Sequence, residues 1–446
     1  MPVTPAFEAG LFKRRREEVL RRMRELSPHG MSVAVFPGMP VATRNNDVEH
    51  PYRADSDVFF LTGFEEPEAV AVLSTGDKPL TLFVRPRDKE REIWNGRRAG
   101  TEGAMKAFGA DVAHEISKLD EELPRLVGNS RTLFYRLGGY DAEFDARMAR
   151  MLRDLRARSR SGQGAPYRIE DPGQIVHELR LRKEPHELQT LRKAAELTRR
   201  GHVAAMKAGK PGVHEYELQS LLEREFRGGG ARGCGYYPIV ASGANATVLH
   251  YNDNCDAVAA GSLVLIDAGA EVDLYTADVT RTFPASGKFT EAQRACYQLV
   301  LDAADEVIRL TKPGATIDGL HDVAVRVLTA GMVKLGLLKG DVETLVKENA
   351  FRKYYMHRTS HWLGLDVHDV GSYKDDEGKP RALEPGMLFT VEPGLYIAQD
   401  DETAAPEFRG IGIRIEDDLL VTPEGYENLT AATPRTVADV EACCSR

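Results

Sequence analysis

Residues 263–284, LVLIDAGAEVDLYTADVTRTFP, place one carboxylate on each of two strand-like runs. The first run is apolar and ends at Asp267, and Asp278 lies in a second run that favours β-structure, so we predict a β-hairpin. A turn centred on Val272 and Asp273 would set the two acids opposite each other, with about 5 Å between their β-carbons, although these residues are not a favoured two-residue turn. Like charges so placed are destabilising unless a cation lies between them. Two surface aspartates are the alternative, so a metal site requires further ligands.

Two further acids follow the same pattern nearer the C-terminus. An apolar run at residues 388–391 ends at Glu392. In residues 410–418, GIGIRIEDD, isoleucines alternate with Arg414 and Glu416, so these two side chains share the face opposite the isoleucines. A glutamate on so apolar a strand is costly unless it is paired or bound to a metal.

Three histidines lie within residues 357–371, HRTSHWLGLDVHDVG, between the hairpin and the later acids. A lone histidine is usually a hydrogen-bonded core residue. Together with the four carboxylates, one imidazole would complete a site whose negative charge matches two divalent cations. Oxygen-rich ligation favours Mn²⁺, with Co²⁺ or Zn²⁺ as alternatives.

The length of 446 residues exceeds what one hydrophobic core usually holds, so two domains are expected. Ser, Gly and Pro accumulate in residues 159–173, where we place the boundary between domains of residues 1–172 and 173–446. A helix and four strand-like runs predict that the first domain is mixed α/β. These runs are residues 31–36, 57–62, 69–74 and 80–84.

The second domain contains an internal repeat. A predicted helix ends at Gly209, residues 210–212 are Lys-Pro-Gly, and a second helix follows. The same order of helix, Lys-Pro-Gly and helix recurs 102 residues later, around residues 312–314. Because helix and break recur together, we predict a duplication in which ligands from both halves converge on a site between them.

Composition excludes several classes of protein. The net charge of −9 gives no general attraction to nucleic acid, and no apolar run approaches the roughly 18 residues of a membrane span. The N-terminus lacks the apolar core of a signal peptide. Five cysteines without a framework spacing are typical of free thiols in a reducing compartment. We therefore expect a cytoplasmic protein that binds neither nucleic acid nor membranes.

In order and spacing, these motifs resemble those of the aminopeptidases P, in the superfamily of methionine aminopeptidase, prolidase and creatinase. The matching motifs are IDAG, ADVTRTFP, SHWLGLDVHDVG, TVEPGLY and GIRIEDD at residues 266–269, 277–284, 360–371, 390–396 and 412–418. The resemblance covers nearly the whole chain. It implies an α/β (α+β) fold, in which an N-terminal mixed α/β domain precedes a pita-bread catalytic domain with an internal pseudo-twofold duplication.

The resemblance implies that five residues bind two divalent metal ions. Asp278 and Glu416 would bridge the ions. Asp267 would complete the coordination of one ion, and His361 with Glu392 that of the other.

The resemblance also implies roles around the substrate. His250 and His368 would hold the scissile region and stabilise the tetrahedral intermediate, and His357 would lie near the proline. Arg414 and Tyr396 would support the metal site. The predicted catalytic residues are His250, His357, His368, Glu392 and Arg414.

Two positions bear on the substrate pocket and on assembly. Arg358 follows His357 where many relatives carry glycine, which leaves the ligands intact and leaves the shape of the far subsite open. Trp94 matches a residue that in relatives approaches the active site from a neighbouring subunit, which implies a homo-oligomer, either a dimer or a tetramer. A partly buried aromatic side chain within one subunit is the alternative for Trp94.

The implied activity is release of the N-terminal residue from Xaa-Pro-Xaa peptides, by attack of a hydroxide that bridges the two metal ions. A peptide bond to proline has no N–H for an ordinary protease to hold, and metal chemistry does not need one. Glu392 is expected to carry a proton to the leaving nitrogen. A prolidase, which cleaves Xaa-Pro dipeptides, is one alternative, and residues 44–70 resemble its N-terminal domain less than that of aminopeptidases P. A non-catalytic binding protein on this fold is another, and the complete ligand set disfavours it.

Overall fold

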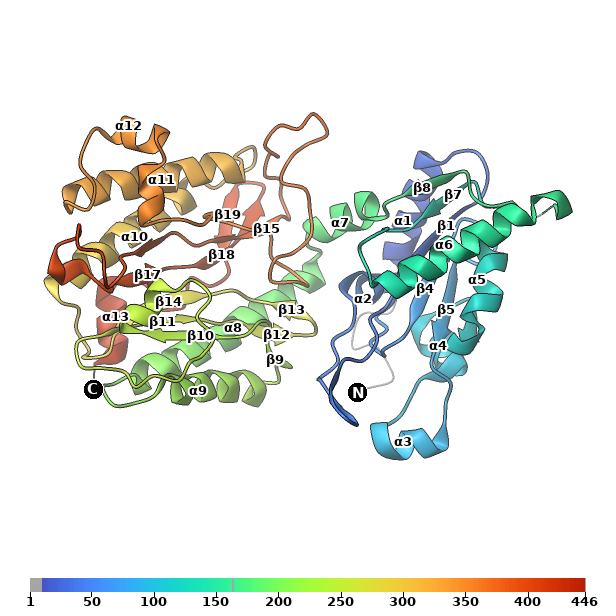
Figure 1. Cartoon of the computed structure of the whole chain (residues 1–446), viewed down its shortest axis with the longest axis horizontal. Coiled ribbons are helices and arrows are strands. Elements are labelled where there is room, and N and C mark those ends of the chain that lie inside the picture. Colours follow the sequence, from blue (N-terminus) through green and yellow to red (C-terminus); the bar gives the residue numbers. More distant parts are fainter. Residues whose placement is uncertain (1–9, 163, 446) are drawn as a thin grey trace. The chain divides into compact units, whose positions relative to one another are not determined.

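Figure 1 shows the computed structural model of the chain, which describes residues 10–162 and 164–445. The chain divides into two compact units, one that ends at Leu179 and one that begins at Arg180. The helix α7 (Gly173–Leu181) spans this division, and it begins at the domain boundary placed from the sequence. Within the described part of the chain, no helix is both long and apolar enough to cross a membrane.

The first unit is built on a mixed sheet of six strands in the order β6-β5-β4-β1-β7-β8. Its strands are β1 (Ser32–Pro37), β4 (Val70–Ser74), β5 (Leu80–Val84), β6 (Val112–Glu115), β7 (Thr132–Phe134) and β8 (Arg168–Glu170), with β2 (Thr43–Asn45) and β3 (Val48–Glu49) as a separate pair. The α-helices are α1 (Leu11–Leu26), α2 (Ser56–Thr62), α3 (Lys89–Asn95), α4 (Gly100–Phe108), α5 (Leu119–Val127) and α6 (Ala142–Ala157). β1 is antiparallel to β4 and parallel to β7, and all its residues are buried, as expected for a strand covered on both faces.

Three of the four strands predicted in this unit are confirmed as β1, β4 and β5, but the prediction for residues 57–62 is wrong, because they form the helix α2. Asp55 caps this helix, since its side chain accepts a hydrogen bond from the backbone N–H of Val58 at 2.9 Å. Gly63 ends it in the left-handed conformation, with a φ of 67°. Every residue of α2 is buried, so the sequence has no polar face whose period would distinguish the helix from a buried strand.

The second unit consists of two halves, each a helix pair followed by antiparallel strands, which confirms the predicted duplication. The first pair is α8 (Pro185–Ala208) with α9 (Glu215–Gly228), and the second is α10 (Glu291–Leu310) with α11 (Ile317–Lys334). The breaks between paired helices make equivalent contacts, because Gly212 N–H donates to Val258 O and Gly314 N–H donates to Leu383 O, both at 2.9 Å. Figure 1 shows the strands lying between the two helix pairs.

Each half contributes a three-stranded antiparallel sheet, β10-β11-β14 in the first and β15-β18-β19 in the second. The first half holds β9 (Gly233–Cys234), β10 (Ile239–Ser242), β11 (Leu263–Asp267), β12 (Ala270–Val272), β13 (Tyr275–Thr276) and β14 (Thr280–Pro284). The second holds β15 (Leu388–Val391), β16 (Gly394–Tyr396), β17 (Gly412–Arg414), β18 (Asp417–Thr422) and β19 (Gly425–Asn428), with α12 (Val342–Lys347) and α13 (Val437–Cys444). Val264 and Ile266 of β11 pack with helix residues in the main core, whereas Leu265 belongs to a separate cluster with Tyr396.

The predicted hairpin is present, but its register differs from the predicted one, in which Asp267 and Asp278 lay opposite each other. β11 pairs with β14 so that Asp267 lies opposite Thr280, not opposite Asp278. The turn is centred on Asp273 and Leu274, one residue later than suggested. Both residues have positive φ, 47° and 69°, as in the type I′ turns whose twist suits a hairpin. Asp278 therefore lies between β13 and β14, outside the paired ladder.

Gly269→Ala tests the close approach that shapes this hairpin. A β-carbon on Gly269 would lie 1.7 Å from the backbone oxygen of Ala277. Overpacking typically costs about 1–3 kcal/mol, and backbone yields less than a side chain, so we expect a loss of about 3 kcal/mol in the free energy of unfolding, measured by urea denaturation. Gly228→Ala is the control, because a β-carbon there meets nothing within 4 Å. Equal stability of the two variants would contradict the prediction.

Candidate active site

Four acids point toward one another because each follows a buried apolar residue of the core. Side chains alternate between the two faces of an extended chain, so an acid that follows a core residue faces away from the core. The acids are Asp267, Asp278, Glu392 and Glu416, and the buried residues before them are Ile266, Ala277, Val391 and Ile415. Each half of the second unit contributes two of the acids.

These acids line a single cavity of about 790 Å³ in the second unit. Every residue predicted as a ligand or a catalytic group lines it, namely Asp267, Asp278, His361, Glu392, Glu416, His250, His357, His368 and Arg414. Apolar side chains such as Ile239, Leu249 and Val367 form other parts of its wall. A concave site with apolar walls and a few convergent polar groups is typical of small-ligand binding.

Asp278 occupies the centre of the acidic cluster. Its Oδ1 accepts a hydrogen bond from the hydroxyl of Tyr236 at 2.5 Å, and its Oδ2 lies 3.4 Å from Nε2 of His361. The same imidazole nitrogen lies 3.5 Å from Oε1 of Glu392. One ligand atom each from Asp278, His361 and Glu416 lie within 4.8 Å of one another. A single ion between these atoms could contact all three.

Arg414 orients two of the acids. Its Nη2 donates to Oδ2 of Asp267 at 2.6 Å, and its Nη1 donates to the hydroxyl of Tyr396 at 2.9 Å. Its Nε donates to Oγ1 of Thr280 at 3.1 Å, and that hydroxyl donates in turn to Oε2 of Glu416 at 2.7 Å. The guanidinium therefore holds Asp267 directly and Glu416 through Thr280.

The acids carry more negative charge than the neighbouring protein cations offset. Burial raises the pKa of Asp278 and raises that of Glu392 to about 7. Burial, together with the Asp278 carboxylate, raises the pKa of Glu416 well above its usual value. Although burial opposes it, the Arg414 guanidinium holds the pKa of Asp267 below its usual value. Four carboxylates and one imidazole, short of positive charge, are a donor set that fits hard or borderline divalent cations.

His361 presents Nε2 to the acids because its other nitrogen is engaged. Nδ1–H donates to the carbonyl oxygen of Trp362 at 3.0 Å, which fixes the tautomer and leaves Nε2 free to bind a cation. Burial alone would lower the pKa of His361, but the carboxylates of Asp278 and Glu392 raise it to about 9. The carboxylates thus favour protonation of Nε2, and a metal ion that binds to this nitrogen would displace the proton.

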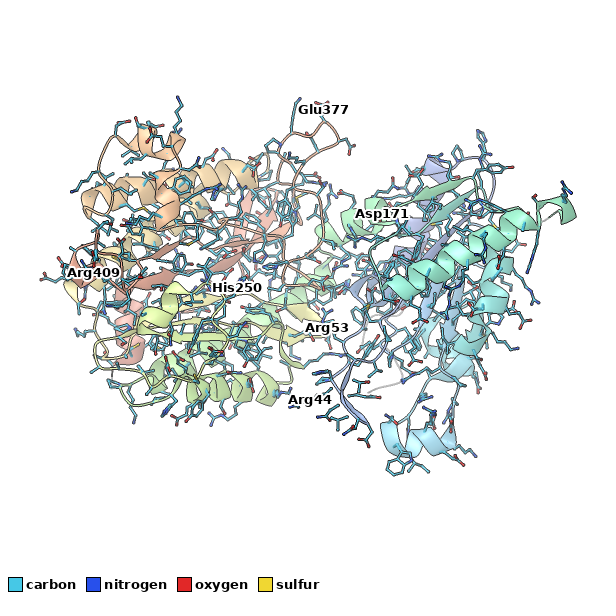
Figure 2. The ribbon with its side chains drawn as sticks, viewed as in Figure 1. Arg44, Arg53, Asp171, His250, Glu377 and Arg409 are labelled. Atoms are coloured by element: carbon cyan, nitrogen blue, oxygen red, sulfur yellow. The ribbon has the colours of Figure 1, made fainter. Side chains whose placement is uncertain are left out.

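The other three histidines surround this cluster. His357 Nε2 lies 2.8 Å from the Tyr396 hydroxyl, and burial lowers the pKa of His357 to about 3, so it is neutral at neutral pH. The ring of His368 stands edge-on to that of His361, with centroids 4.4 Å apart, and burial and the His361 charge lower its pKa. His250, labelled in Figure 2, lies on the loop between β10 and β11, and its two neighbours in sequence pack against those strands.

Two residues that were not predicted from the sequence, Tyr236 and Thr280, hold the cluster together. The hydroxyl of Tyr236 lies 2.7 Å from Oδ1 of Asp267 and 2.5 Å from Oδ1 of Asp278, so its one proton is shared between both aspartates of the hairpin. Tyr236 precedes Asp267 by the same number of residues as His361 precedes Glu392, so the internal repeat is the signal that could have identified it. Thr280 lies in the motif ADVTRTFP, but its link between Arg414 and Glu416 has no signature in the sequence.

A buried ion cluster anchors the loop that carries His361 and His368. Asp369 accepts hydrogen bonds from Arg180 Nη2 at 2.6 Å and from Lys183 Nζ at 2.9 Å. These three side chains are at most 3% exposed. Burial opposes ionisation of Asp369, yet the two cations hold its pKa below the usual value. Since Asp369 directly follows His368, this cluster fixes the backbone that presents His368 to the cavity.

Comparison with known proteins identifies the family. Metallopeptidase family M24 matches residues 189–423, and the N-terminal domain of aminopeptidase P matches residues 12–135. The chain is 45% identical over 434 residues to the Xaa-Pro aminopeptidase of Escherichia coli (strain K12), which covers 97% of this chain and 96% of that one. The chain belongs to the Xaa-Pro aminopeptidases of metallopeptidase family M24.

Solved structures agree with this assignment. Aminopeptidase PepP of Pseudomonas aeruginosa superposes on the aminopeptidase with a TM-score of 0.95 at 45% sequence identity, covering 99% of both chains. Zinc-substituted E. coli aminopeptidase P in complex with product has a TM-score of 0.93 at 43% identity, covering 98% of both chains. The fold predicted from the sequence, an N-terminal α/β domain before a pita-bread domain, is confirmed.

The aminopeptidase is a metallopeptidase that releases the residue preceding proline at the N-terminus of peptides. The predicted activity is therefore confirmed. Divalent metal ions are the cofactors of such an enzyme, and the group of Asp278, His361 and Glu416 offers them a place to bind.

Asp369→Asn tests the buried ion cluster. Asparagine removes the negative charge of Asp369, so the buried positive charges of Arg180 and Lys183 are no longer fully neutralised. We therefore expect a loss of about 3–5 kcal/mol in the free energy of unfolding at neutral pH. Because the folded-state pKa of Asp369 is lowered, its contribution is fully present above the pKa of an unfolded aspartate, about 4, and is lost as pH falls from there through the lower folded-state pKa. Wild type and variant should therefore converge in acid. Chemical denaturation across pH measures this, with exposed Asp376→Asn as the control; a loss below about 1 kcal/mol at neutral pH would refute it.

Proposed function

We propose that the aminopeptidase holds two divalent metal ions in this cavity and uses them with neighbouring side chains to cleave Xaa-Pro-Xaa peptides. The observation that carries the proposal is the convergence of four carboxylates, two of them buried and two at most 16% exposed, and one imidazole, with a single acid, Asp267, bonded to a guanidinium. The proposed ligands are Asp267, Asp278, His361, Glu392 and Glu416. Two divalent cations would offset the charge that the protein leaves uncompensated.

Asp278 and Glu416 are the proposed shared ligands. The position of Asp278 supports this role, because one of its oxygens faces the Tyr236 side of the cluster and the other faces His361. Asp267 would complete one ion, and His361 with Glu392 would complete the other. Carboxylate-rich ligation favours Mn²⁺. Co²⁺ and Zn²⁺ are alternatives, and the zinc-substituted E. coli relative supports Zn²⁺.

When bound, two such ions polarise a carbonyl oxygen and lower the pKa of a water molecule. Glu392 accepts a proton from the water molecule that attacks the carbonyl carbon, and it delivers this proton to the proline nitrogen as the C–N bond breaks, because that nitrogen must be protonated to depart. The position of Glu392 supports this role, because its Oε1 lies 3.5 Å from Nε2 of the proposed ligand His361 and its Oε2 lies 3.7 Å from Nδ1 of His357, the histidine beside the proline.

The histidines around the cluster orient the substrate. His368 has a lowered pKa, so at neutral pH it keeps one N–H donor for the carbonyl oxygen on which negative charge develops. His250 lines the same cavity and holds the scissile region, and neutral His357 lies beside the proline. Arg414 acts through Asp267 and Glu416, whose carboxylates it holds in place.

We also propose a cytoplasmic homo-oligomer, either a dimer or a tetramer. All five cysteines are free thiols, which is typical of a reducing compartment. Ile93 and Trp94 of α3 are 81% and 87% exposed, and such an apolar pair supports a protein interface. The proposed domains are residues 1–172 and 173–446, because α7 begins at that boundary.

Glu392→Gln tests the proton-transfer role. Glutamine retains the shape but neither carries charge nor accepts a proton, so we expect kcat/KM on a tripeptide to fall at least about 100-fold. The free energy of unfolding of the metal-free protein should be unchanged or higher, because a buried charge is removed. Exposed Glu424→Gln is the control. Turnover close to wild type would refute the proton-transfer role of Glu392.

The substrate class is tested with protein stripped of metal and refilled with Mn²⁺. Hydrolysis of an Xaa-Pro-Xaa tripeptide is measured beside that of the Xaa-Pro dipeptide by the free amino acid released. We expect rapid cleavage of the tripeptide, dependent on the added metal. Cleavage of the dipeptide alone would indicate a prolidase, and activity of the stripped protein equal to that of the refilled protein would remove the metal from the proposal.

A further inference from the structure

Arg358 brings a positive charge to the active-site cavity from outside the cluster of acids. It directly follows His357, and its guanidinium pairs with the carboxylate of Asp318, in the first turn of α11. Both side chains line the cavity, and they are 56% and 47% exposed. The pair therefore stands where the cavity meets solvent.

The donors of Arg358 are not consumed by the metal-binding residues. Arg414, the other guanidinium in the cavity wall, is buried and bonded to Asp267, Tyr396 and Thr280. Arg358 bonds to Asp318 through Nη2 within the described part of the chain. A guanidinium has five N–H donors in a planar fork that suits a carboxylate. Donors of Arg358 thus remain for an anion that enters the cavity.

Contacts within the cavity place Arg358 on the leaving-group side. Nδ1 of His357 lies 3.7 Å from Oε2 of Glu392 and 2.7 Å from the carbonyl oxygen of Arg358. In the proposed function, Glu392 protonates the proline nitrogen. The part of the peptide that follows the proline therefore extends past His357 toward Arg358.

Ser360 supplies a second polar group on this wall. It lies two residues after Arg358 and also lines the cavity. Its side chain is 4% exposed, and its hydroxyl has no hydrogen-bond partner among the described residues. A buried hydroxyl without a partner is costly, and a peptide carbonyl or N–H in the cavity would satisfy it.

We propose that Arg358 binds the C-terminal carboxylate of a tripeptide substrate, so that the enzyme prefers short peptides with a free C-terminus. An extended peptide spans at most about 3.3–3.6 Å per residue. The carboxylate of Xaa-Pro-Xaa thus lies two residues, about 7 Å, beyond the scissile bond. This inference rests on the proposed function, which sets the direction of the peptide.

The test compares a tripeptide Xaa-Pro-Xaa with its C-terminal amide, using wild-type enzyme and Arg358→Gln, both loaded with Mn²⁺. For wild type at low ionic strength, we expect kcat/KM for the acid to exceed that for the amide about three- to fivefold, as suits a half-exposed ion pair. The difference should lie in KM, because the contact is the same in ground and transition states. It should shrink in high salt.

The Arg358→Gln variant should cleave acid and amide equally well, with kcat on the amide as in wild type. Arg352→Gln, at an exposed arginine outside the cavity wall, is the matched control and should keep the wild-type preference. A wild-type enzyme that cleaves both substrates equally, or an unchanged preference in Arg358→Gln, would overturn the inference and leave the aminopeptidase activity standing. Cleavage of neither substrate by wild type would instead overturn the proposed function.

Discussion

Repulsion among four carboxylates that have little exposure to solvent is the constraint on which the second unit depends. Asp267, Asp278, Glu392 and Glu416 share one cavity, and burial raises the pKa of three of them. Neutral neighbours cannot remove the free-energy cost of placing these negative charges together away from water. Arg414 offsets part of it at Asp267, and a divalent ion offsets the remainder at a metallopeptidase site. The cost of bringing these acids together in the absence of cations is therefore the driving force for binding them.

The rigidity of the surrounding fold makes that crowding possible. Each acid follows a core residue of its half, so the apolar packing of the strands fixes where the carboxylates point. Hydrogen bonds from Tyr236, Thr280 and Arg414 then set the orientation of individual oxygens. Farther out, the ion cluster at Asp369 holds the histidine loop. The site is thus supported by successive layers of contacts, and the outermost pair, Lys183 with Asp369, is more buried than Asp267 or Glu392 at the centre.

The sequence predicted those features that depend on local pattern. Apolar runs that end in acids located the carboxylates, and the recurring Lys-Pro-Gly break located all four long helices of the second unit. Prediction failed where tertiary context decides. The helix α2 is buried all round and shows no amphipathic period. The hairpin register follows from left-handed conformations at Asp273 and Leu274, and leucine rarely adopts this conformation. The role of Tyr236 depends on contacts between distant segments.

The two halves of the second unit are related but not identical, and this difference gives the cavity a polarity. A site with true twofold symmetry would offer the same groups to both ends of a bound peptide. Here Tyr236 stands beside Asp267 where His361 stands beside Glu392, so a phenol faces one end and an imidazole faces the other. A peptide lying in the cavity in the reverse direction would meet the wrong partner at each end. Divergence between the repeats therefore provides what an exopeptidase requires, a means of distinguishing the beginning of a chain from its continuation.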